Sequence, residues 1–137
     1  MLKRGITVTT IQFEVNTPQA HFINERCFGE DFATWLRTRL EPAVTSVSDP
    51  IAEDWGWALI VEFDRIKWTI AIGIADDSIG QSPAEWRVDV AYEKSLNGIS
   101  ALFRKKPAEA WGRLFETTLG ILKSGLDPNA RSIQAGA

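Results

Sequence analysis

The residues best suited to nucleophilic chemistry are the single histidine and the single cysteine of the chain. His21 and Cys27 lie in one stretch without regular apolar periodicity, and an imidazole close to a thiol could remove its proton. The sequence contains no Gly-x-Ser-x-Gly nucleophile elbow. The simpler interpretation is that Cys27 is a small buried apolar residue. The sequence therefore predicts no catalytic residue.

Neighbouring carboxylates are the second feature that could carry chemistry. Glu53 and Asp54 directly precede Trp55, and acid pairs beside aromatic rings are typical of sugar-processing sites. Adjacent side chains on an extended chain point in opposite directions, however, so these two acids are not placed to act on one bond. The alternative interpretation is a charged entry to a strand, which keeps a sheet edge soluble.

Metal and cofactor sites have little support in the sequence. One histidine and one cysteine do not supply the three or four ligands that a zinc ion needs. Asp76 and Asp77 lack the ligand spacing of an EF-hand, and a solvated loop is the simpler interpretation. No glycine-rich phosphate-binding motif occurs. We expect no metal and no cofactor.

Composition indicates one ordinary globular domain covering residues 1–137. A net charge of −3 disfavours a nucleic-acid partner, and the basic cluster at 104–106 is interpreted as a solvated loop. The single cysteine excludes an intrachain disulfide. No apolar run is long enough to span a membrane, and no signal-peptide pattern follows Met1. We expect a cytoplasmic protein without a membrane partner.

Three segments predict a tryptophan-rich antiparallel meander in the middle of the chain. Large apolar residues alternate with small or polar ones over 55–63, 68–74 and 85–93. A turn at Arg65-Ile66 would place Phe63 opposite Trp68, or a four-residue loop would give the same register. Pairing Ile74 with Trp86 then keeps every large side chain on one face. We expect the other tryptophans to be buried in the core, and Trp55, at the start of its strand, is the one candidate for exposure.

The remaining segments supply a first strand, two helices and a possible last strand. Residues 6–15 read as a strand whose alternation slips once, which predicts a β-bulge near Thr9-Thr10. Helical apolar spacing predicts helices at 30–40 and from Pro107 to about Gly125. Residues 94–106 are ambiguous, 131–134 are a possible edge strand, and 135–137 are expected to be mobile.

The order of elements predicts an α+β fold. It reads β-α-β-β-β-α with a possible final strand, and strands grouped in this way form an antiparallel sheet. Both helices carry one apolar stripe, so we expect the two helices to pack on one face of the sheet, the face that carries the tryptophans.

The opposite face of the meander is the candidate binding surface. It would present small residues, among them Ala58, Ala71 and Gly73, with Arg87 and Asp89 at its charged rim. A flat surface of this kind suits close approach of another chain or of a covering segment. It also suits simple exposure to water, and the sequence leaves both interpretations open.

Two hypotheses of function follow. The first is a non-catalytic protein-binding domain, either a homodimeric accessory factor or an immunity-like protein. The second is a small-molecule binder or enzyme at the Trp55 end of the sheet, where Glu53, Asp54 and Arg87 would supply polar contacts. The first is preferred, because every residue needed by the second also has an adequate structural role.

A resemblance to a group of small uncharacterised bacterial proteins covers about residues 50–134. It is carried by the motif Glu53-Asp54-Trp55-Gly56-Trp57, by the segment 95–106 and by the closing helix with Leu126-Asp127-Pro128. In architecture and charge, the chain is also similar to some small acidic immunity proteins that neutralise secreted toxins. That likeness implies a protein partner and transfers no binding residue.

Overall fold

A computed structural model describes residues 3–92, 107–127 and 131–136. Within them, seven strands form one antiparallel sheet of order β2-β4-β5-β6-β1-β7, with β3 paired to β4. The strands are β1 (Lys3–Thr10), β2 (Ser46–Val47), β3 (Ile51–Glu53), β4 (Gly56–Phe63), β5 (Ile66–Ile74), β6 (Ala84–Tyr92) and β7 (Arg131–Gly136). The helices are α1 (Glu30–Leu40) and α3 (Pro107–Gly125), with 3-10 turns η1 (Glu41–Ala43) and η2 (Asp76–Ser78).

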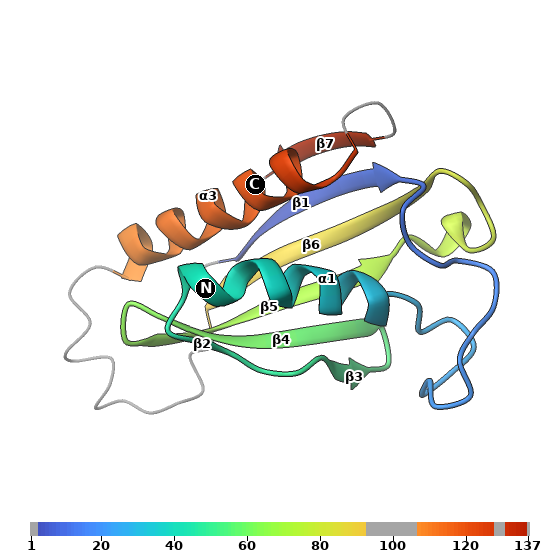
Figure 1. The fold of residues 1–137 in the computed structure, drawn as a ribbon, viewed down its shortest axis with the longest axis horizontal. Coiled ribbons are helices and arrows are strands. Elements are labelled where there is room, and N and C mark those ends of the chain that lie inside the picture. Colours follow the sequence, from blue (N-terminus) through green and yellow to red (C-terminus); the bar gives the residue numbers. More distant parts are fainter. Residues whose placement is uncertain (1–2, 93–106, 128–130, 137) are drawn as a thin grey trace.

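Both helices lie on the same side of the sheet, as the sequence predicts (Figure 1). Every second residue of the central strands faces them and is buried: Ile6, Val8, Trp57, Leu59, Val61, Trp68, Ile70, Ile72, Trp86, Val88 and Val90. Phe32 and Leu36 of α1 and Phe115 of α3 complete this core. The α+β fold and the shared aromatic face are therefore confirmed. Neither of the two described helices combines the length and the hydrophobicity that a membrane span requires.

The register of the meander is partly as predicted. Ile74 pairs with Trp86, as expected, whereas Phe63 pairs with Ile66 and Val61 pairs with Trp68. The predicted turn at Arg65-Ile66 is therefore wrong. A shift of this kind keeps the side-chain parity, so each large residue still lies on the predicted face.

The turn between β4 and β5 consists of Asp64 and Arg65. Both have positive φ, 55° and 64°, as in a type I′ turn. That turn normally carries Asn and Gly, and neither residue occurs at position 64 or 65. Arg113 of α3 donates a hydrogen bond of 2.6 Å from its Nη2 to the carboxylate of Asp64, which fixes the turn to the helix.

We expect the substitution Arg65→Gly to stabilise the protein by about 0.5–1 kcal/mol. Glycine adopts the left-handed conformation without the steric cost borne by Arg65, although it loses more backbone entropy on folding. Urea unfolding followed by tryptophan fluorescence measures the change. Lys67→Gly, at an exposed position of β5, is the control and should destabilise by about 0.5–1 kcal/mol. An equal loss in both variants would contradict the argument.

The first strand ends earlier than predicted. β1 stops at Thr10, whose hydroxyl accepts a hydrogen bond from the backbone N–H of Gln12. The chain turns there, Ile11 becomes exposed, and Phe13 and Val15 reach the core from a loop. The slip in alternation therefore marks the end of the strand, and the predicted bulge is wrong.

Two further segments differ from the prediction. Residues 51–53 form β3, which pairs with β4 around a turn at Asp54 and Trp55. Glu53 therefore ends β3, and the following strand begins at Gly56 instead of Trp55. The predicted edge strand at 131–134 exists as β7 and continues through Ala135 and Gly136, which pair with Ile6 and Gly5. The predictions for 94–106 lie outside the described residues.

Candidate functional site: the open face of the sheet

The side of the sheet away from the helices is left uncovered by either described helix, and we call it the open face. Its residues alternate with the core residues of the same strands: Gly5, Thr7, Ile51, Ala58, Ile60, Thr69, Ala71, Gly73, Arg87 and Asp89. Strand pairing arranges them in rows. Ile51, Ala58, Ala71, Asp89 and Gly5 form one row, the Asp89 row, and Gly73, Arg87 and Thr7 form the next, the Arg87 row.

An ion pair lies in the middle of the open face. Arg87 Nε is 2.7 Å from Oδ1 of Asp89, which lies two residues further along β6. The Asp89 side chain is 15% exposed and the Arg87 side chain 52%. A Cβ atom on Gly5 would collide with the guanidinium of Arg87. The absence of a side chain at Gly5 thus lets Arg87 lie against the sheet, and the two charges largely neutralise each other there.

The turn between β3 and β4 lies at one edge of this face. A Cβ atom on Gly73 would be 3.1 Å from the carbonyl oxygen of Trp55, so the backbone of Trp55 lies over Gly73. The Trp55 side chain is 52% exposed, and Ile51 in the adjoining strand is 40% exposed. Two large apolar side chains thus remain in water beside rows of small residues.

The loop before α1 holds this turn in place. The Cys27 thiol lies 3.3 Å from the carbonyl oxygen of Glu53 and 3.5 Å from that of Gly56, so it can donate to either end of the turn. Asn24 donates to the carbonyl oxygen of Asp54 at 3.1 Å. The indole of Trp57 donates to the Cys27 carbonyl oxygen at 2.9 Å. Hydrogen bonds from the loop before α1 therefore fix the backbone on both sides of the exposed Trp55.

Cys27 and His21 take structural positions. Cys27 is fully buried, and burial, as the largest cause, raises the pKa of its thiol; a nucleophilic cysteine requires the opposite shift. His21 Nε2 lies 2.6 Å from Glu30 Oε1, and its ring stands edge-on to Phe22. The interpretation of Cys27 as a buried apolar residue is confirmed.

The predicted site residues come together in part. Ala58, Ala71 and Asp89 share one row, and Gly73 and Arg87 share the next. Glu53 is the last residue of β3, while Asp54 and Trp55 form the turn. The backbone of Trp55 lies over Gly73, where a side chain would crowd it. At Gly73, therefore, the small residue makes room for a covering segment of the same chain, one of the two alternatives that the sequence analysis left open.

Three residues of the open face escaped the sequence analysis: Gly5, Thr7 and Ile51. Ile51 belongs to a strand of only three residues, too short to show alternation, and Gly5 lies beside Arg87 through a long-range pairing of β1 with β6. The signal for Ile51 was present as an apolar residue just before the Glu53-Asp54 pair.

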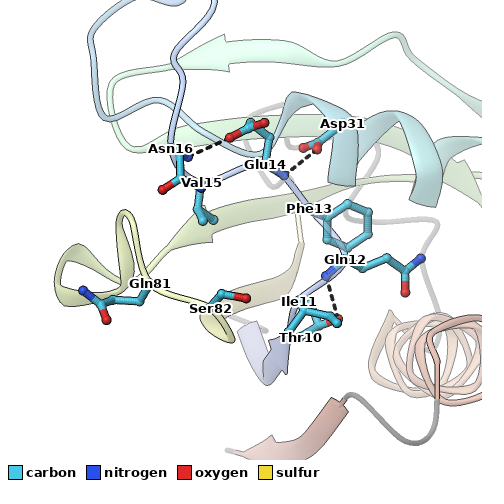
Figure 2. A pocket seen from close by; sticks show the side chains of 10 residues that line it. All are labelled: Thr10, Ile11, Gln12, Phe13, Glu14, Val15, Asn16, Asp31, Gln81 and Ser82. Carbon is cyan, nitrogen blue, oxygen red and sulfur yellow. Dashed lines mark hydrogen bonds between the residues drawn. The ribbon is translucent and has the colours of Figure 1, made fainter.

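A polar cavity of about 450 Å³ lies at another part of the molecule, where β1 ends and the loop 80–83 passes (Figure 2). Its two carboxylates serve the local backbone. Glu14 accepts from the N–H groups of Asn16 (2.8 Å) and Thr17 (3.1 Å), and these bonds lower its pKa. Asp31 accepts from the N–H groups of Glu14 and Phe32. None of the predicted site residues lines this cavity.

Within the described residues, no group of His, Cys, Asp and Glu is placed to hold a metal ion. Comparisons with protein families, with curated proteins and with solved structures found no match to this chain. The resemblance to small bacterial proteins therefore stays a prediction, and the case for a function depends on the geometry of the open face.

Proposed function

We propose that the chain is a non-catalytic protein-binding domain and that the open face is its contact surface. The observation that carries the proposal is the pair of exposed side chains Ile51 and Trp55, which border this face while most large apolar residues are in the core. Contact surfaces are enriched in tryptophan and arginine over other exposed surface. The open face offers both, in Trp55 and Arg87.

The fixed turn adds to the case. Ordering flexible groups on binding opposes association, so an anchor that is already held binds more tightly. The hydrogen bonds from Asn24 and Cys27 to the turn remove much of that cost for the backbone of Trp55.

The small-molecule alternative draws less support from the geometry. The three cavities described lie at the end of β1, beside Arg113, and at the start of α1, and neither Trp55 nor Arg87 lines them. Ligand sites are usually concave. A flat face with a tryptophan at its edge suits a protein surface better.

Site-specific photocrosslinking in the expressing cell tests the proposal. A photoreactive residue at Thr69 or Glu85, both on the open face, should give an adduct of defined mass. The same residue at Thr34, exposed on α1 on the opposite side of the sheet, should not. Adding Ala71→Arg, which places a bulky charge in the Asp89 row, should abolish the adduct. Absence of an adduct from both open-face positions would overturn the proposal.

A further inference from the structure

We infer that the open face binds a second copy of this chain, face to face, about a two-fold axis that crosses the strands between the Arg87 row and the Asp89 row. This inference rests on the proposed function and names the partner. The order of charges on the open face selects this axis, and the same axis places a small residue opposite the exposed Trp55 turn.

The charges select the axis because a two-fold interface is isologous, so that if residue i meets residue j, then j also meets i. Arg87 and Asp89 have opposite charges and lie two residues apart on the same side of β6. An axis across the strands between them places Arg87 against the partner subunit's Asp89, twice over. An axis running along β6 would place Arg87 against the partner subunit's Arg87, and like charges repel.

The same axis also covers the exposed Trp55 turn. Rotation about this axis places each strand over the same strand of the partner and reverses its direction. The Arg87 row of one chain therefore faces the Asp89 row of the other. Trp55 lies over Gly73 in the Arg87 row, and Ile51 lies at the β3 end of the Asp89 row. The Trp55 turn of one chain, which lies over Gly73 of β5, therefore faces the partner subunit's Ala71 and is covered by a small residue. Ile51 faces the end of the partner's β3 that carries Glu53.

The ion pair does not oppose this packing as strongly as isolated charges would. Burying a charge costs free energy because its hydration is lost. Asp89 is already 15% exposed and already bonded to Arg87 within its own chain, so much of its hydration is lost on folding rather than on association. In the dimer, Arg87 also faces the partner subunit's Asp89, and Asp89 also faces the partner subunit's Arg87.

Complementary charge variants test the dimer and its axis. Arg87→Asp leaves two acidic residues on β6, and Asp89→Arg leaves two basic ones. Each variant alone sets like charges across the axis, and we expect its dimer dissociation constant to rise by about 30-fold or more. An equimolar mixture sets acid against base at both positions, and we expect it to form a dimer with one chain of each kind.

Sedimentation equilibrium and native mass spectrometry measure these states. Both variants lack the Arg87–Asp89 pair within the chain, so recovery in the mixture reports only contacts between chains. Circular dichroism tests whether each variant is folded. If a variant does not fold, the concentration dependence of the wild-type mass still decides, because a monomer at every concentration overturns the inference. A mixture that stays monomeric, or variants that dimerise alone, overturns the axis.

The crosslinking experiment separates this inference from the proposed function. An open-face adduct of twice the chain mass supports both. An open-face adduct of another defined mass, with a monomeric wild-type protein, keeps the proposed function and overturns the dimer. The absence of any open-face adduct overturns the proposed function itself.

Discussion

Gly56→Ala should lower the free energy of unfolding by about 2–4 kcal/mol, the larger of the stability effects expected in this chain. Gly56 has φ of 152°, a conformation that side-chain-bearing residues rarely adopt. A Cβ atom there would also collide with the carbonyl oxygen of Ile72 in β5, which is backbone and cannot rotate away. Chemical denaturation followed by tryptophan fluorescence measures the loss.

Gly112→Ala is the matched control for that substitution. Gly112 lies inside α3, and a Cβ atom there would meet nothing within 4 Å. Alanine favours the helix by about 0.5–1 kcal/mol over glycine, so this variant should be slightly more stable than the wild type. A Gly56→Ala variant as stable as the Gly112→Ala variant would show that the β3–β4 turn is not constrained as described.

Trp55→Ala should weaken association by about 30-fold or more while leaving the folded chain intact. In the proposed dimer the second copy covers Trp55, and truncating a large aromatic side chain that a partner buries costs about 2 kcal/mol or more of binding free energy. The Trp55 side chain is 52% exposed in the single chain, so about half of it is already packed, and its loss should lower the free energy of unfolding by about 1–2 kcal/mol, less than Gly56→Ala. Sedimentation equilibrium gives the first quantity and urea unfolding the second.

Ile11→Ala provides the control for Trp55→Ala. Ile11 is 58% exposed, but it follows the end of β1 and lines the polar cavity instead of the open face. Its truncation removes a similar kind of exposed apolar surface and should leave the dissociation constant unchanged. An equal effect of the two substitutions would mean that association depends on general surface hydrophobicity and not on the open face.

Much of the fold could be predicted because side-chain alternation is a local property. Trp68, Ile70 and Ile72 occupy every second position of β5, so their side chains lie on the same face wherever the preceding turn is placed, and all three are buried. The turn itself could not be predicted, because Asp64 and Arg65 adopt positive φ without glycine or asparagine. Their conformation is imposed by the pairing of β4 with β5, which the local sequence does not show.

The candidate site could be predicted only where it follows from the same parity. Arg87 and Asp89 were assigned to one surface because they alternate with Val88 and Val90. Their direct bond depends on Gly5, which comes from a strand at the other end of the sequence. Likewise, the bonds from Cys27 to the β3–β4 turn join a loop and a hairpin that no local pattern relates.

The place of β1 in the sheet has a consequence for how the chain folds. β1 lies between β6 and β7, so Val8 pairs with Trp86 on one side and with Ile133 on the other. The hairpin of β4 and β5 closes through a turn of two residues, whereas β1 pairs with β6 and β7, which are both far from it in the sequence. Contacts of such long sequence separation slow folding. The meander is therefore the part of the sheet that can form first, and the β1 pairings complete it late.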